Sequence, residues 1–259
     1  MLEKVFVFIF GSIVGSFLNV CIYRIPKGRS IVAPGSHCPN CGVSIKWFDN
    51  IPILSYIILG GRSRCCKTKI SLRYIIVEIL TALLFLVLFL FFGLSAKFFA
   101  YIILVCGLII ATFVDFEIQE IPDEVSLGGL VVGLSLSVMF PSILNESSRI
   151  HGFANSFFGA FAGAATIYAM GILGEFAFKK EAMGGGDVKL LAMIGSFIGW
   201  KMTLLTFFIA PLFGSIVGII LKIRQGKDVI PYGPYLSLAA VTAILWGDKI
   251  LSFLFRGLY

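Results

Sequence analysis

The stretch YIIVEILTALLFLVLFLFF, residues 74–92, is almost entirely apolar and has a single charged side chain. A helix needs about 20 mostly apolar residues to cross the hydrocarbon core of a bilayer, and this run has that length. Similar runs recur along the chain, so the sequence predicts an all-α polytopic membrane protein with about eight transmembrane helices. The expected spans are 5–23, 74–92, 98–114, 125–142, 153–174, 187–200, 203–221 and 233–255.

The composition excludes a water-soluble domain. Of 259 residues, 58% are hydrophobic and 14% are charged, and the mean hydropathy is +0.99. The first apolar run, 5–23, is followed by Arg24 rather than by a small-residue cleavage site, so we expect a retained helix and not a removed signal peptide. The expected parts are this first helix (1–23), a cysteine-containing module (24–73) and a seven-helix membrane core (74–259).

Charge is distributed unevenly along the chain. The only long polar stretch, 24–73, carries nine Lys or Arg against one acid, Asp49. Since positive charge accumulates on the cytosolic side of membrane proteins, we expect this module to be cytosolic. With eight spans, the loops near 115–124, 175–187 and 222–232 share that side, and both termini lie on the other. Orientation accounts for the net charge of +7, so no nucleic-acid partner is predicted.

The polar module contains four cysteines in two groups. In HCPNCG, residues 37–42, proline and glycine favour a tight turn that directs both thiols of a C-x-x-C pair at one metal ion. The second group is irregular, because its cysteines are adjacent in the sequence. A reducing cytosol disfavours a disulfide, so zinc or a similar metal is expected. The expected ligands are Cys38, Cys41 and Cys66, with Cys65 or His37 in fourth place.

Two acidic segments flank the expected membrane helices. In ATFVDFEIQEIPDEVSL, residues 111–127, Asp115 lies at the end of the third span, and Asp187 begins the sixth. If these helices are neighbours, two poorly hydrated carboxyl groups meet and share a proton. Such a pair can activate water to attack a peptide carbonyl without a metal ion. The residue types leave the partner of Asp187 open between Asp115 and Asp123, which flank the same loop.

The second segment, MGGGDVKLLAMIG, spans residues 183–195. Gly184, Gly185 and Gly186 allow backbone conformations that are closed to other residues, and they let a substrate backbone approach closely. An alternative is that Asp187 is only an N-cap, since aspartate accepts the free amide groups at a helix start. At membrane depth, however, an ionisable group is more often functional.

Seven stretches together resemble the type IV prepilin peptidase family, bifunctional membrane enzymes of the GxGD aspartyl protease class. They occur in the family's order and cover nearly the whole chain. The stretches are GSFLNVCIYRIP (15–26), CPNC (38–41), NIPILSYIILGGR (50–62), ISLRYIIVE (70–78), DFEIQEIPDE (115–124), GGGDVKLLAMIG (184–195) and IPYGPYLSLAA (230–240).

The resemblance implies that Asp115 and Asp187 are the catalytic pair and that Asp123 is the accompanying acid. The family removes the basic leader of type IV prepilins or pseudopilins, the subunits of type IV pili and type II secretion systems, at the cytosolic face of the bacterial inner membrane. It then methylates the new N-terminal residue with S-adenosylmethionine. Methyl transfer is associated with the cysteine module, where Gly61 stands at a glycine position of the family. Ser63 departs from the family, because it stands where members have their third cysteine.

Four acids of the loop suggest a substrate contact. We expect Glu117, Glu120, Asp123 and Glu124 to hold the basic leader at the membrane surface, with Lys189 among the supporting residues. The alternative is that these acids only solvate the loop and cap the next helix.

Two other classes of function remain as alternatives. A proton-coupled transporter would use Asp115 and Asp187 as a proton relay and the glycines to break a helix at a substrate site. Such transporters usually have repeated halves, which this sequence lacks. A structural protein of an assembly would leave the acid pair unexplained. We therefore favour the peptidase, acting on prepilins in the lipid bilayer, with no metal in the peptidase site.

Overall fold

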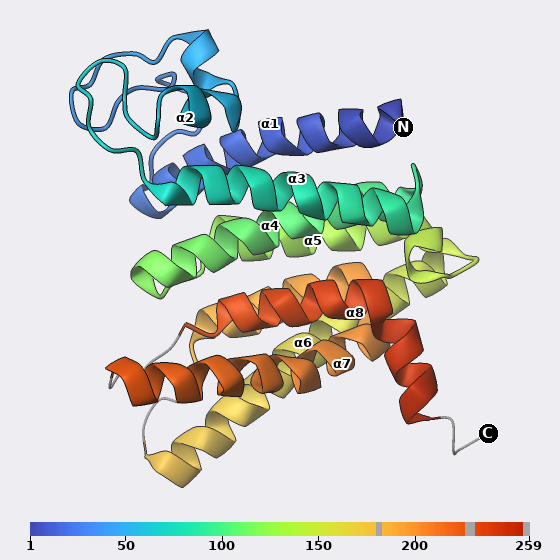
Figure 1. Ribbon diagram of the computed structural model, residues 1–259. Coiled ribbons are helices and arrows are strands. Elements are labelled where there is room, and N and C mark those ends of the chain that lie inside the picture. Colours follow the sequence, from blue (N-terminus) through green and yellow to red (C-terminus); the bar gives the residue numbers. More distant parts are fainter. Residues whose placement is uncertain (180–182, 226–230, 256–259) are drawn as a thin grey trace. The chain divides into compact units, whose positions relative to one another are not determined.

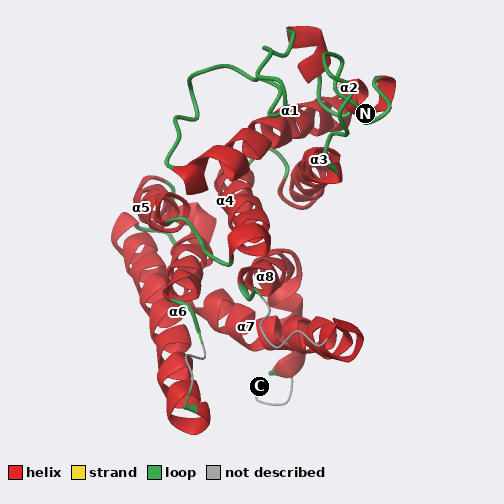
Figure 2. Ribbon diagram, turned by 90° about the vertical axis from the view of Figure 1, so that its left-hand side faces the viewer, coloured by secondary structure: helices red, strands yellow, loops and turns green. Residues whose placement is uncertain are grey.

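The structure is a computed structural model, and it describes residues 1–179, 183–225 and 231–255. Every regular element within these residues is a helix, and Figure 2 shows no strand among them. The helices form two compact units, Met1–Gly93 (unit 1) and Leu94–Tyr259 (unit 2). The predicted all-α fold is therefore confirmed.

Unit 1 is built on two long helices that lie side by side (Figure 1). A Cβ added to Gly11 would lie 2.8 Å from the Cα atom of Ala82, and one added to Gly15 would lie 2.8 Å from that of Glu78. The absence of side chains at these glycines lets the two backbones approach closely, as small residues do between membrane helices. The elements of unit 1 are α1 (Leu2–Arg24), η1 (Ile25–Lys27), η2 (Trp47–Asn50), α2 (Leu54–Ile58) and α3 (Leu72–Phe92).

Unit 2 is a helical bundle in which α6 packs along α7, and α7 along α8. Its elements are α4 (Ala96–Ile118), α5 (Asp123–Met139), η3 (Pro141–Leu144), α6 (Arg149–Phe178), α7 (Gly185–Gln225) and α8 (Gly233–Leu254).

The long element α7 reverses direction at Gly199, which has non-helical backbone angles of φ 75° and ψ 168°. Both Gly186 and Gly233 lie against Ile121, so α7 and α8 begin at the same place. Further along α7, Gly214 lies against Tyr235 near the start of α8. A straight helix would carry Gly214 about 42 Å from Gly186. The second half of α7 therefore returns to the end where the first half began.

Six helices among the described residues are long and apolar enough to cross a membrane: α1, α3, α4, α6, α7 and α8. They confirm a multi-pass membrane protein but not the predicted count of eight. The expected span 125–142 is the 17-residue helix α5, which is short for a bilayer. The expected spans 187–200 and 203–221 both lie in α7, whose helical backbone is interrupted at the single residue Gly199.

Candidate active site

Asp115 lies in the last turn of α4, and its side chain is buried inside unit 2. The residue is 5% exposed, and its Oδ2 atom accepts a hydrogen bond of 2.9 Å from the backbone N–H of Gly233. Gln119 ends α4 in the left-handed conformation, directly beyond this turn. The start of α8 therefore holds the Asp115 carboxylate in place through a main-chain donor.

Asp187 lies in the first turn of α7, where its backbone N–H donates a 3.1 Å hydrogen bond to the carbonyl of Gly184. Because α7 begins at Gly185, Asp187 is inside the helix and is not its N-cap residue. The side chain is half-buried. A negative charge in the first turn is favourable, because the free amide groups of a helix start carry partial positive charge.

The three glycines before Asp187 have different surroundings. None has a positive φ, so the expectation of unusual backbone conformations is wrong at these positions. The expected close approach is found at Gly186, where an added Cβ would lie 3.1 Å from Cβ of Ile121. At Gly184 an added Cβ would lie 3.6 Å from Oδ2 of Asp187, whereas at Gly185 it would meet nothing within 4 Å. The glycines therefore leave open space on one side of the carboxyl group.

The structure brings Asp115 and Asp187 together. Their carboxyl groups are near enough for the charges to interact. The side chain of Ile121 touches the positions of both Gly186, next to Asp187, and Gly233, whose N–H binds Asp115. Three helix ends, those of α4, α7 and α8, therefore meet around one carboxyl pair, of which Asp115 is buried and Asp187 half-buried.

Asp123 has a different environment from Asp115. Its carboxylate forms an ion pair with Lys189, with Oδ1 and Oδ2 at 2.6 and 2.9 Å from Nζ. The side chain of Asp123 is 57% exposed and that of Lys189 39%. Geometry thus separates the two candidate partners of Asp187, since Asp115 is buried beside it and Asp123 is exposed and paired with Lys189. The remaining loop acids, Glu117, Glu120 and Glu124, are also exposed.

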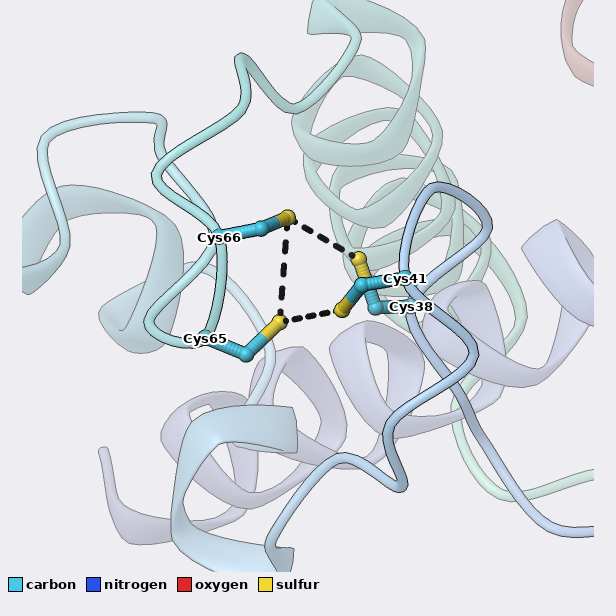
Figure 3. Close-up of side chains that lie close together, drawn as sticks. All are labelled: Cys38, Cys41, Cys65 and Cys66. Atoms are coloured by element: carbon cyan, nitrogen blue, oxygen red, sulfur yellow. Dashed lines mark hydrogen bonds between the residues drawn. The ribbon is translucent and has the colours of Figure 1, made fainter.

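In unit 1 the four cysteines of the polar module converge (Figure 3). The Sγ atoms of Cys38, Cys41, Cys65 and Cys66 all lie within 4.8 Å of one another. The separations include 3.1 Å between Cys41 and Cys65 and 3.6 Å between Cys38 and Cys66. Four thiolates around zinc at about 2.3 Å would lie about 3.8 Å apart, so this arrangement fits a tetrahedral metal site. His37 instead places Nδ1 3.1 Å from the carbonyl of Gly35.

The two cysteine turns have the same main-chain hydrogen bonds. In the first turn the N–H of Cys38 donates to the carbonyl of Val43, and the N–H of Gly42 donates back to Cys38. In the second, the N–H of Ser63 donates to Thr68, and the N–H of Lys67 donates back to Ser63. Gly42 and Lys67 both have a positive φ, of 72° and 58°. Position 63 is therefore equivalent to position 38, and position 66 to position 41.

Ser63 consequently stands in a ligand position without a thiol, and Cys65 supplies the thiol from the middle of the same turn. The Ser63 hydroxyl lies 2.9 Å from the Sγ atom of Cys65 and 3.6 Å from that of Cys38. The side chain at position 63 thus points into the cluster, and the irregular spacing that the sequence shows does not prevent four thiols from meeting.

Local hydrogen bonds set the charge of these thiols. The Thr68 hydroxyl, followed by its backbone N–H, lowers the pKa of Cys66 to about 5. The backbone N–H groups of Cys41 and Asn40 lower the pKa of Cys38. Cys41 differs, because its hydrogen bond with Cys65 raises its pKa to about 12. The cluster therefore favours thiolates at Cys38 and Cys66, the form that binds metal.

Unit 1 also contains a cavity of about 780 Å³ between α1 and the irregular module. Its wall along α1 is mostly apolar, with Phe17 among its residues, but it also contains Ser12 and Ser16. Arg24, Ser36 and Asn50 add further polar groups to the lining. Arg24 is fixed there, because its Nη2 atom donates a 2.7 Å hydrogen bond to the carbonyl of Pro34. Cavities of a few hundred cubic ångströms are typical of small-molecule sites.

Gly61 lies in the same module and has a φ of 67°. A Cβ at this position would lie 3.0 Å from the hydroxyl of Tyr56. The positive φ and this contact both favour glycine, so the structure gives Gly61 a role in the shape of the module.

Comparison with known proteins identifies two family models along the chain. Residues 9–92 match the bacterial peptidase A24 N-terminal domain, and residues 102–219 match the type IV leader peptidase family. A prepilin leader peptidase/N-methyltransferase of Pseudomonas aeruginosa is 36% identical to this chain, over 93% of the chain and 89% of that protein.

The chain belongs to the type IV leader peptidase family.

Other members of the type IV leader peptidase family are similarly related. A prepilin leader peptidase/N-methyltransferase of Myxococcus xanthus is 37% identical over 87% of this chain and 65% of its own length. A type 4 prepilin-like proteins leader peptide-processing enzyme of Escherichia coli O78:H11 is 36% identical over 90% of each chain. No solved structure matches the chain. The N-terminal family model falls within unit 1, and the peptidase model falls within unit 2, which contains both aspartates.

Sequence reasoning missed several residues of this site. Gly233, the main-chain donor to Asp115, lies in the IPYGPY stretch, whose Pro-Tyr-Gly-Pro pattern indicates a turn but not its partner. Ile121, between the two helix starts, carries no signal of its own in the sequence. Thr68 was also missed, although a hydroxyl two residues from Cys66 is a common donor to a thiolate.

Proposed function

We propose that this protein is a membrane aspartyl endopeptidase that removes the leader of type IV prepilins or pseudopilins and N-methylates the new N-terminal residue. The observation that carries this proposal is the meeting of Asp115 and Asp187 at three helix ends of unit 2, in a member of the type IV leader peptidase family. The names of the relatives, prepilin leader peptidase/N-methyltransferase, support both activities.

The geometry suggests how the two aspartates divide the chemistry. The N–H of Gly233 donates to Asp115 and so stabilises a negative charge there. Asp115 then acts as the general base and takes a proton from the attacking water. Asp187 carries the shared proton and gives it to the carbonyl oxygen of the scissile peptide. In the tetrahedral gem-diol intermediate, the proton on Asp115 passes to the leaving amine, a hydroxyl of the intermediate returns a proton to Asp187, and the C–N bond breaks to give the carboxylic acid and the free amine.

The acidic loop supports recognition of a basic leader. Glu120, Asp123 and Glu124 are exposed at the end of unit 2 that holds the carboxyl pair. Positive residues of a leader are attracted to this end while the apolar helix of the substrate stays in lipid. Replacing Glu120 and Glu124 by lysine should raise KM, most strongly at low salt. Cleavage kinetics that do not change with these substitutions or with salt would contradict the proposed contact.

Methyl transfer is assigned to unit 1, with S-adenosylmethionine as the donor. The 780 Å³ cavity and the adjacent module of Gly61 support this assignment. Zinc is the proposed metal of the cysteine cluster, where the four thiols Cys38, Cys41, Cys65 and Cys66 would hold it. A bound zinc ion would join the two turns and stabilise the module. The peptidase chemistry proposed here uses no metal.

The cellular setting follows from charge. Nine Lys or Arg against one acid in 24–73 favour a cytosolic position for this module by the positive-inside rule. We assign the protein to the bacterial inner membrane, with the carboxyl pair open to the cytosolic face, where a basic leader is exposed. The substrates are prepilins or pseudopilins of pilus or secretion assemblies.

The deciding experiment is co-expression with a prepilin and detection of leader removal. Asp115→Asn and Asp187→Asn should each abolish cleavage, because each removes one half of the proton-sharing pair. Asp248→Asn is the matched control, since Asp248 is an exposed aspartate of α8 remote from the pair in sequence, and it should cleave normally. Processing that survives both substitutions would refute the peptidase and leave the proton-coupled transporter as the better interpretation.

A further inference from the structure

Tyr232 occupies an unusual position beside the carboxyl pair. Its hydroxyl oxygen is buried and has no hydrogen-bond partner among the described residues. Tyr232 directly precedes Gly233, whose N–H binds Asp115 at 2.9 Å. Its ring lies against Gly214 of the returning half of α7, where an added Cβ would be 3.8 Å from Cε2. The ring is therefore packed against α7 at the start of α8, and among the described residues its hydroxyl has no hydrogen-bond partner.

The hydroxyl also lies within the electrostatic reach of the site. Burial, and secondly the charge of Asp187, raise the pKa of Tyr232 to about 12. The phenol therefore keeps its proton at neutral pH and is available as a hydrogen-bond donor.

A buried hydroxyl without a partner destabilises the fold, because it has lost its hydrogen bonds with water. A phenylalanine would fill the same space without that cost, and this chain uses phenylalanine at 26 positions. A tyrosine here is thus poorly explained by stability. Residues that break such a rule without a structural gain tend to lie at functional sites.

We propose that the Tyr232 hydroxyl is a catalytic hydrogen-bond donor that binds the carbonyl oxygen of the scissile peptide and stabilises the tetrahedral intermediate. The inference rests on the proposed peptidase function and adds one residue to its site. The partner is an acceptor, because the phenol is protonated, and the acceptor that a peptide brings to an aspartyl pair is its carbonyl oxygen. The hydroxyl makes and breaks no covalent bond. Its hydrogen bond strengthens as water attacks and the carbonyl oxygen gains negative charge, before the proton of Asp187 has fully passed to that oxygen.

The test is the Tyr232→Phe substitution, which keeps the ring and removes only the donor. We expect kcat for prepilin cleavage by the purified full chain to fall about 100- to 1000-fold, the range found when one such donor is removed. KM should change little, since the bond is strongest in the transition state. The melting temperature should stay equal or rise, because the variant no longer buries an unpaired hydroxyl.

Tyr235→Phe is the matched control. Tyr235 lies three residues further along, is buried, and packs against the same Gly214, but its hydroxyl is not among the buried unpaired atoms. This variant should cleave at the wild-type rate.

Three outcomes would overturn the inference. The first is a wild-type kcat for Tyr232→Phe. The second is a lower kcat accompanied by a lower melting temperature, which would show a structural role. The third is an equal loss in Tyr235→Phe, which would show general sensitivity of this helix start. If the wild-type chain itself fails to cleave a prepilin, the proposed peptidase function falls, and this result differs from all three.

Discussion

Moving one thiol within the second cysteine turn should first destroy and then restore metal binding. Cys65→Ser removes the thiol that lies 3.1 Å from the Sγ atom of Cys41. The double variant Ser63→Cys/Cys65→Ser places the thiol instead at the position equivalent to Cys38. The Ser63 hydroxyl already lies 3.6 Å from the Sγ atom of Cys38, close to the roughly 3.8 Å between thiolates around zinc.

The expected size of the effect follows from the number of ligands. Zinc bound by four protein ligands contributes about 10–16 kcal/mol in small peptides, so one ligand of four is worth roughly 3 kcal/mol. Affinity in Cys65→Ser should therefore fall about 100-fold, and the double variant should recover most of this loss. The double variant has the regular C-x-x-C spacing in both turns, so we expect its affinity for zinc to equal or exceed that of the wild type.

The measurement is metal content of the purified full chain, followed by competition with a chelator of known affinity. Cys106→Ala is the control, because Cys106 lies in α4, outside the cluster. Wild-type affinity in Cys65→Ser would show that Cys65 is not a ligand. Failure of the double variant to bind better than Cys65→Ser would show that positions 63 and 38 are not equivalent, and the reasoning from the main-chain hydrogen bonds would be refuted.

Three further substitutions test the contacts of both units. Gly233→Ala puts a Cβ 2.8 Å from Oδ2 of Asp115, so the carboxylate must move, and cleavage should fall about 100-fold with unchanged helix content by circular dichroism. Gly61→Ala forces alanine to a φ of 67°, and mass spectrometry of the pilin should show cleavage retained but methylation reduced. Lys189→Glu should lower stability by about 0.2–1 kcal/mol, and adding Asp123→Lys should restore the melting temperature, because this exposed pair would then re-form with reversed charge.

The sequence predicted the helices well, because an apolar run of about 20 residues has few alternatives in a bilayer. The sequence did not predict that two of the expected helices are joined in one element by a reversal of direction. The expected spans 187–200 and 203–221 lie in one element that reverses at Gly199, with φ 75°. One glycine among 28 in the chain gives no local sign of such a reversal. The contacts of Gly186 and Gly233 with Ile121, and of Gly214 with Tyr235, are what reveal it.

For the carboxyl pair, too, the sequence pattern alone did not decide between alternatives. Periodicity and composition left Asp115 and Asp123 equivalent, since both flank one loop. The contact that separates them is the ion pair of Asp123 with Lys189, 66 residues away. The family resemblance selected Asp115 without giving a physical reason. The structure supplies one, because Asp115 is buried at 5% exposure and Asp123 is turned outward.

The cysteine cluster was the easier site to predict, because both turns are short and local. The tight turn of HCPNCG orients its two thiols through local backbone geometry, without contacts from distant parts of the chain. The choice between Cys65 and His37 depended on how the two turns face each other, which the spacing alone does not determine. The shared main-chain pattern at Ser63 and Cys38 is likewise visible only in the hydrogen bonds.

Close packing of main chain explains why glycine stands beside both carboxylates. Ile121 fills the space between Gly186 and Gly233, at 3.1 and 3.2 Å from the Cβ atoms that these residues lack. A Cβ at either position would be in tight contact with Ile121, so Ile121 or one of the helices would have to shift and the spacing of the aspartates would change. The chemistry proposed for this site therefore depends on the distance between three helix ends, and the glycines set that distance. It follows that Ile121→Gly, which removes the Cβ atom 3.1 Å from the new one, should partly rescue Gly186→Ala, whereas it should not rescue Gly233→Ala, whose new Cβ also meets Asp115 directly.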